Sequence, residues 1–93
     1  MQPFAELLRD YLNHAGLSQS RFAELADTDQ GFISQILAET RRPPLNRIGD
    51  WATILDLDPE TTQQFIDAAH LAHSTQHVRD MVADLRRRLD ENA

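Results

Sequence analysis

The chain has 93 residues, of which 41% are hydrophobic and 6% aromatic, with a formal net charge of −6 and no cysteine. This length allows one domain with a modest core, and the scarcity of glycine favours a helical domain over a turn-rich sandwich. The composition excludes disulfide frameworks and thiolate zinc sites, and without a membrane-spanning or signal pattern we expect a soluble, cytoplasmic protein.

The negative charge is distributed unevenly along the chain. Residues 1–48 contain five arginines and six acids, a balance of −1, whereas residues 49–93 contain four arginines and nine acids, a balance of −5. Salt screens charges over about 8 Å at physiological ionic strength, so a local face decides whether the first half attracts DNA. The overall balance still predicts weak non-specific affinity for nucleic acid.

Two helices are expected at the start of the chain. The first, residues 2–15, has Pro3 in its first turn and apolar residues at helical spacing, and Gly16 follows as a left-handed cap. Ser18 is a good N-cap for the second helix, which should run to about Ala26 with its apolar residues turned inward. The polar residues that follow should break this helix.

A third helix is expected from Gln30 to about Glu39, with Asp29 as its N-cap. Its buried face comprises Ile33, Ile36 and Leu37. Its opposite face carries no charge and comprises Gly31, Ser34, Gln35 and Ala38, with Gln30 at the N-terminal tip. A solvated face usually carries Glu, Lys or Arg, whereas a face against base edges needs small residues and amides that donate and accept hydrogen bonds. The outward face therefore indicates contact with DNA bases.

An extended loop with two adjacent positive charges, Arg41 and Arg42, should follow before the double proline. A fourth helix at about residues 45–55 is expected to bury Leu45, Ile48, Trp51, Ala52 and Leu55, with the tryptophan as a core residue. A fifth helix is expected from Asp58-Pro59-Glu60 to about His73. Asp58 is its N-cap, Pro59 suits the first turn, and the acidic Glu60 is favourable near the positive end of the helix dipole. Its apolar face comprises Phe65, Ala68, Ala69 and Ala72.

Ser74 or Thr75 is expected to cap a sixth helix. Its apolar residues fall within roughly a 100° arc of a helical wheel and comprise Val78, Met81, Val82, Leu85 and Leu89. Five helices should already close a core, so this narrow seam favours pairing with a second copy over packing in the same chain. We therefore expect a main domain at residues 1–73 and a C-terminal amphipathic helix at residues 74–93.

Between Leu17 and Pro43 the chain resembles the helix-turn-helix of Cro/repressor-type, XRE-like transcriptional regulators. The matching stretches are Leu17-Ser18-Gln19, Phe22-Ala23, Ile33-Ser34-Gln35-Ile36 and Arg41-Arg42-Pro43, without a gap. Three positions depart from the family pattern. Asp27 stands at the usual turn glycine, Leu37 replaces a frequent glutamate, and Glu39 replaces a second glycine, which leaves the end of the third helix to Thr40 and the prolines.

The resemblance implies an all-α fold, a five-helix repressor-like DNA-binding domain with the C-terminal helix in addition. It implies that Gln30 and Gln35 reach base edges in the major groove, that Gly31 permits close approach, and that Ser34 bonds a base or phosphate. It also implies phosphate contacts from Gln19 at the start of the second helix and from Arg41 and Arg42, with Asn46 and Arg47 as weaker candidates. Phe32 lies between the two faces and either packs on the second helix or touches a thymine methyl or sugar.

Other chemistry is not indicated by the sequence. His70, His73 and His77 would share a face on an unbroken helix, but the expected break at Ser74 or Thr75 separates them, so no metal or cofactor is expected. The chain has no phosphate loop, no HExxH motif and no nucleophile pair, and we do not expect an enzyme.

The sequence favours a sequence-specific, DNA-binding transcriptional regulator of bacterial or phage style, with double-stranded DNA as partner and a homodimer as the active form. Two alternatives remain open. One is a protein-interaction module, in which a helix-turn-helix scaffold with an acidic surface binds a protein partner. The other is the antitoxin of a toxin–antitoxin pair, which would combine both activities.

Overall fold

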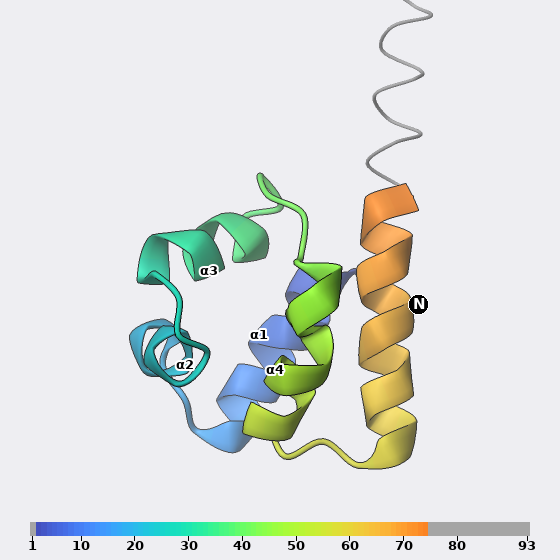
Figure 1. Ribbon diagram of the computed structural model, residues 1–93, viewed down its shortest axis with the longest axis horizontal. Helices are drawn as coiled ribbons and strands as arrows, with labels where there is room; N and C mark the ends of the chain where they lie inside the picture. Colours follow the sequence, from blue (N-terminus) through green and yellow to red (C-terminus); the bar gives the residue numbers. More distant parts are fainter. Residues whose placement is uncertain (1, 75–93) are drawn as a thin grey trace, which may run out of the picture.

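The computed structural model describes residues 2–74, and within this range every regular element is helical. The elements are α1 (Phe4–Ala15), α2 (Gln19–Leu25), α3 (Gln30–Leu37), the short 3-10 turn η1 (Leu45–Arg47), α4 (Ile48–Ile54) and a helix at 59–74. Figure 1 shows α2 and α3 on one side of the molecule, the 59–74 helix on the other, and α1 and α4 between them. The predicted all-α class is confirmed. The five seam residues of the expected sixth helix lie outside the described residues.

A single hydrophobic core holds the helices together. Trp51, Phe22 and Phe65 are fully buried in it, and the Trp51 ring meets Phe22 edge-on with the centroids 5.3 Å apart. Phe4 stacks on Phe65 at 4.8 Å and so joins α1 to the 59–74 helix. Burial of each such side chain contributes about 1.5–3 kcal/mol. The predicted core role of Trp51 is therefore confirmed.

The prediction that Leu45 is buried in the core was wrong. Its side chain is 39% exposed, because residues 45–47 form the turn η1 and α4 begins only at Ile48. The tighter turn takes Leu45 out of register with the buried face of α4, which keeps Ile48, Trp51 and Ala52.

The first four helices end in the same way, with one residue in the left-handed conformation. These residues are Gly16, Asp27, Glu39 and Asp56, with φ of 71°, 53°, 62° and 56°. In each case the next amide bonds to the carbonyl five residues before it, as Thr40 N–H does to the Gln35 oxygen at 3.0 Å. The third helix was expected to run to about Glu39 and to be ended by Thr40 and the prolines, and this prediction was wrong. Glu39 itself takes the place of the missing glycine, and α3 ends at Leu37.

Helix starts follow the predicted caps with two exceptions. The Ser18 hydroxyl accepts the Arg21 amide at 3.1 Å, and the Asp58 carboxylate accepts the Thr61 amide at 2.7 Å. Asp29 holds the N-cap position of α3, but its side chain makes no cap hydrogen bond. Pro3 occupies the cap position before α1 rather than its first turn.

The 59–74 helix buries the face that the sequence predicted, with Phe65, Ala68 and Ala69 inaccessible and Ala72 half-buried. Residue 74 is still helical, so the helix does not stop at His73 and Ser74 does not break it. The other cap candidate, Thr75, lies outside the described residues.

Candidate nucleic-acid interface

The turn between α2 and α3 sets how the two helices face the solvent. Asp27, with φ of 53°, reverses the chain, while buried Phe22 and Ile33 pin the two helices to the core. The Arg47 guanidinium donates to the Ala26 carbonyl at 2.7 Å and so holds the end of α2. Arg47, a weaker candidate for DNA contact, is thus half-buried and engaged within the fold.

The outward face of α3 lies where the sequence placed it. Gln30, Gly31 and Gln35 are exposed and Ser34 is half-buried, while Ile33 and Ile36 on the other face are inaccessible. A Cβ atom added at Gly31 would meet nothing within 4 Å. The protein's own packing therefore does not require glycine there, and the bare backbone is open to an external partner.

One hydrogen bond joins α2 to the outward face of α3. The Ser34 hydroxyl donates to the Gln19 side-chain oxygen at 2.8 Å, across 15 residues of sequence. Because this bond uses the oxygen of the amide, Gln19 presents its nitrogen, which carries two donors. The structure brings together two predicted interface residues, Gln19, expected at a phosphate, and Ser34, expected at a base or phosphate.

Phe32 packs against the core and supports a neighbouring arginine. Its half-buried ring lies edge-on to Trp51 of α4, with the centroids 6.4 Å apart. The guanidinium carbon of Arg41 lies 4.9 Å from the centroid of the same ring, within cation–π range. These contacts favour a packing role for Phe32, against Trp51 of α4, over contact with a thymine methyl or sugar.

The loop after α3 carries Arg41 and Arg42, both of which are exposed, whereas Pro43 is buried. The ring nitrogen Nε2 of His73 lies 2.6 Å from the Pro43 carbonyl oxygen and donates to it. Sequence reasoning missed this role of His73, because 30 residues separate the partners and no local pattern links them.

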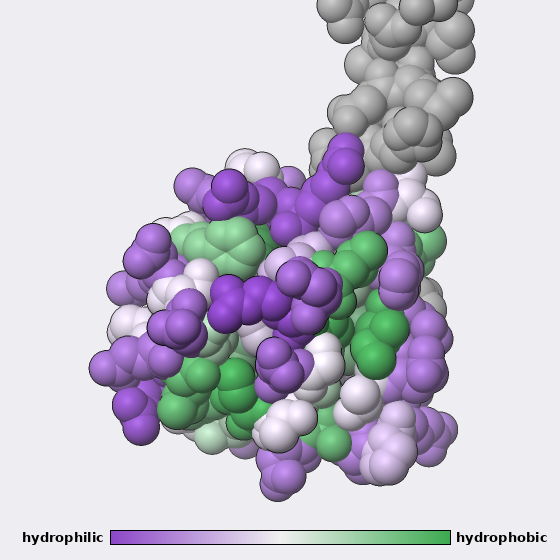
Figure 2. Space-filling model, viewed as in Figure 1, coloured by the Kyte–Doolittle hydropathy of each residue, from purple (hydrophilic) through white to green (hydrophobic). Residues whose placement is uncertain are grey.

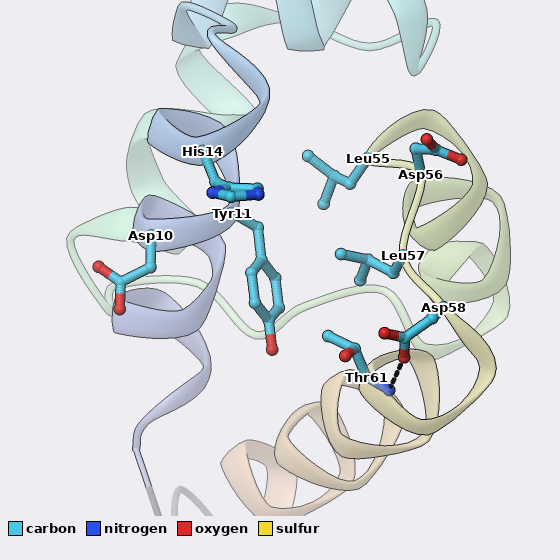
Figure 3. A pocket seen from close by; sticks show the side chains of 8 residues that line it. All are labelled: Asp10, Tyr11, His14, Leu55, Asp56, Leu57, Asp58 and Thr61. Carbon is cyan, nitrogen blue, oxygen red and sulfur yellow. Dashed lines mark hydrogen bonds between the residues drawn. The ribbon is translucent and has the colours of Figure 1, made fainter.

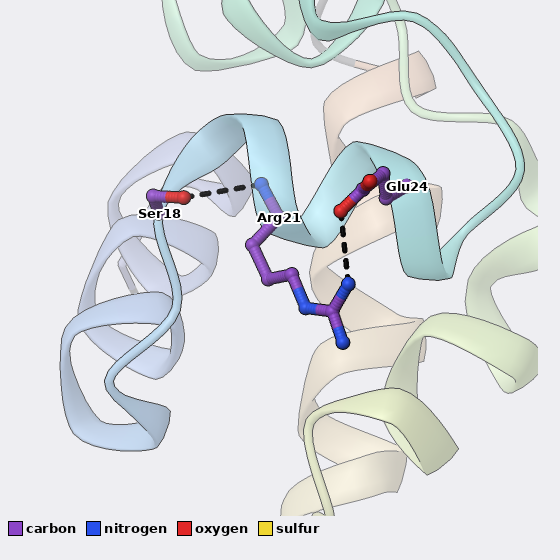
Figure 4. Close-up of polar contacts among 3 residues, drawn as sticks. All are labelled: Ser18, Arg21 and Glu24. Atoms are coloured by element: carbon purple, nitrogen blue, oxygen red, sulfur yellow. Dashed lines mark hydrogen bonds and ion pairs between the residues drawn. The ribbon is translucent and has the colours of Figure 1, made fainter.

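The charge around α2 and α3 is close to balanced. Arg21 and Glu24 form an exposed ion pair at 2.9 Å on α2, shown with the Ser18 cap in Figure 4. Residues 17–44 carry three arginines and four acids, a balance of −1. The space-filling view shows a largely hydrophilic face with separate hydrophobic patches (Figure 2). Long-range attraction to a polyanion is therefore weak at this interface.

A separate pocket of about 420 Å³ lies between the end of α1 and the segment that leads into the 59–74 helix. Figure 3 shows its lining, which comprises Asp10, Tyr11, His14, Leu55, Asp56, Leu57, Asp58 and Thr61. Burial, together with the nearby carboxylates of Asp10 and Asp58, raises the pKa of Tyr11. No residue of α2 or α3 lines this pocket, so it is distinct from the candidate interface.

Residues 2–74 show neither a metal-binding cluster nor a membrane-spanning helix. This part of the chain holds no cluster of three or more His, Cys, Asp or Glu side chains arranged to bind a metal ion. None of its helices has the length and apolar character needed to cross a bilayer.

A comparison with protein families matches residues 8–61 of the chain, more than half of its length, to the helix-turn-helix family. The match begins within α1 and ends in the first turn of the 59–74 helix, so it contains α2, α3 and the loop that follows. Comparisons with curated proteins and with solved structures found no match.

Proposed function

Because the chain belongs to the helix-turn-helix family of Cro/repressor-type, XRE-like regulators, a class of DNA-binding domains, we propose that it is a sequence-specific transcriptional regulator. In this proposal α3 enters the major groove of double-stranded DNA and reads base edges. Such a regulator acts in the compartment that holds the DNA, which for a protein of bacterial style is the cytoplasm.

The observation that carries the proposal is the uncharged, exposed face of α3 on a helix whose other face is fully buried. Gln30 and Gln35 each combine a donor and an acceptor, which suits bidentate pairing with adenine. Gly31 adds no side-chain bulk between them. A helix face with these properties lies against base edges at little desolvation cost, since no charge has to leave water.

The neighbouring groups are suited to the DNA backbone. Gln19, held by Ser34 at 2.8 Å, presents amide donors at the start of α2. Arg41 and Arg42 lie in the loop after α3 and are exposed. Phosphate contacts from these three residues would set the register of α3 in the groove without reading sequence themselves.

We further propose that the protein binds DNA as a homodimer. With a balance of −1 over residues 17–44, one copy gains little from counterion release, and a second copy would supply the missing affinity. The seam residues Val78 and Leu85 follow Leu71 at intervals of seven and fourteen, and Leu71 is 48% exposed on the 59–74 helix. An exposed leucine in register with the seam supports pairing through residues 74–93.

A selection from a pool of random DNA duplexes tests the function. We expect enrichment of one short motif, arranged as an inverted repeat with half-sites about 34 Å apart if the dimer is correct. A single half-site would support base reading and contradict the dimer. Failure to enrich any sequence, with binding to random duplexes no stronger than background, would overturn the DNA proposal and favour the protein-interaction module or a partner-dependent antitoxin.

A further inference from the structure

A side chain of the 59–74 helix forms a hydrogen bond to the loop that follows α3. His73 is partly buried, and its Nε2 lies 2.6 Å from the carbonyl oxygen of Pro43. A carbonyl oxygen only accepts hydrogen bonds, so Nε2 carries the hydrogen. The bond spans 30 residues and connects the last turn of the described chain to the segment that carries Arg41 and Arg42.

We call residues 40–44 the arginine loop, and its backbone has few ways to be held. Pro43 and Pro44 lack an amide hydrogen, so this end of the loop can be fixed only through its carbonyls and by packing. The Pro44 carbonyl accepts the Arg47 amide at 2.9 Å, which belongs to the next turn, and the Pro43 carbonyl accepts His73. At the other end, the Thr40 amide and hydroxyl both bond to the Gln35 carbonyl.

Between these two anchors lie Arg41 and Arg42. Arg41 has a side-chain support in the Phe32 ring, but that contact acts on the guanidinium and leaves the backbone path undetermined. The Thr40 bonds hold the first end of the arginine loop, and Pro43, which is buried and bonded to His73, holds the second end. The bond from His73 therefore contributes to where the second half of the arginine loop lies relative to α3.

We propose that His73 is a positioning residue for DNA binding, which holds the Pro43 carbonyl and thereby presents Arg41 and Arg42 to the phosphate backbone. The inference rests on the proposed function, since it concerns the same interface. Its physical basis is preorganisation: a loop already held in its bound path loses less conformational freedom when phosphate contacts form.

The test replaces His73 by leucine, which keeps bulk and helix propensity but removes the donor, and by glutamine, whose amide nitrogen still donates. His70→Leu is the matched control, because His70 is exposed on the same helix. Binding to the selected duplex and to a random duplex is measured by fluorescence anisotropy over a salt series. Amide hydrogen exchange of Arg41 and Arg42 is measured without DNA, and thermal melting monitors the fold.

His73→Leu should weaken binding to both duplexes by roughly tenfold and flatten the dependence of affinity on salt, because phosphate contacts are lost. It should also speed exchange of the Arg41 and Arg42 amides. His73→Gln should recover most of the affinity, and His70→Leu should behave like the wild type. Should the leucine variant fail to fold, His73→Ala in the same assays replaces it.

Two outcomes would overturn the inference. If His73→Leu only lowers the melting temperature, with affinity and salt dependence unchanged well below the transition, His73 merely stabilises the fold. If the exchange of Arg41 and Arg42 is unchanged, the bond does not hold the loop. If the wild type binds no duplex, the proposed function fails, and the exchange experiment still decides whether His73 orders the loop.

Discussion

At the scale of single residues, α3 divides its side chains between two tasks. Ile33 and Ile36 are inaccessible and fix the helix to the core, while Gln35 between them on the chain is exposed. A change at the exposed position therefore alters the candidate interface without creating a cavity. Mutations on this face should leave stability unchanged, which makes them suitable tests of the proposed DNA contacts.

Gln35→Ala should weaken binding to the selected DNA site by about 1–3 kcal/mol and relax the preference at one base pair. The reason is the loss of an amide that donates to and accepts from a base edge. Competition binding against single-base variants of the selected site measures both effects. Unchanged base preference would remove Gln35 from the base-reading set.

Arg42→Ala should weaken binding to selected and random duplexes alike, since phosphates carry no sequence information. It should also reduce the dependence of affinity on salt. Gln64→Ala, at an exposed site on the 59–74 helix, is the control for both changes. Equal losses on selected and random DNA for Gln35→Ala and Arg42→Ala would contradict the assignment of base and backbone roles.

At the scale of helices, the chain stores strain at three helix ends. Asp27, Glu39 and Asp56 all adopt a left-handed backbone, which costs a residue such as glutamate about 1–2 kcal/mol and costs aspartate less, because its short polar side chain tolerates this conformation better. Glycine serves at only one of the four ends, after α1. These helix ends are therefore the places where sequence and backbone disagree most.

Glu39→Gly should stabilise the protein by about 1 kcal/mol, because glycine adopts the left-handed conformation without steric cost. Urea unfolding followed by circular dichroism measures the change. Gly16→Ala is the reverse change at the end of α1 and should destabilise the protein by a similar amount. The added methyl group meets no neighbouring atom, so the cost comes only from the left-handed backbone. A Glu39→Gly variant less stable than wild type would show that the glutamate side chain makes a compensating contribution.

Asp58 makes the start of the 59–74 helix sensitive to acid. The Thr61 amide bonds to its carboxylate and lowers its pKa below the usual 3.8. The contribution of this cap is therefore present above the unfolded pKa and is lost as pH falls through the lower folded-state pKa. Asp58→Asn keeps a cap but does not titrate.

The wild type should accordingly lose stability relative to Asp58→Asn as the pH falls below about 4. Urea midpoints of the two proteins at pH 7, 5, 4 and 3 measure the difference. A difference that is independent of pH would mean that the ionised carboxylate contributes nothing to the cap.

At the scale of the whole molecule, α2 and α3 lie on the side of the core opposite to the 59–74 helix (Figure 1). The candidate interface and the 59–74 helix are thus carried by different elements. In the proposed dimer, a second copy would pair through residues 74–93 while α3 faces DNA. The proposal is compatible with the net charge of −6, since most of that charge lies in residues 49–93.

Leu85→Asp should convert the proposed dimer into monomers, because it places a charge in an apolar seam. Sedimentation velocity at micromolar concentration measures the mass, and Gln64→Asp at an exposed helix position is the control. The Leu85→Asp protein should also bind an inverted-repeat site more weakly, because it no longer dimerises. An unchanged mass of the Leu85→Asp protein would contradict the seam.

Local signals in the sequence predicted the helices well. Ser18, Asp58 and Gly16 act as caps as expected, and the buried faces of α3 and the 59–74 helix match their apolar periodicity. These features depend on interactions within about four residues, which a single sequence displays directly. The prediction that Leu45 is buried was wrong, because residues 45–47 form a 3-10 turn and the apolar spacing assumed an α-helix from Leu45 onward.

By itself, then, the sequence determined the helical class, the family and the residues on the outward face of α3. Only the tertiary structure decided which distant residues support this region. Ser34 bonds to Gln19, Phe32 packs between Trp51 and Arg41, and His73 bonds to Pro43. The physical reason is separation along the chain. Contacts across 9 to 30 residues form only when packing of the core brings the helices together, and no periodicity or cap encodes them locally.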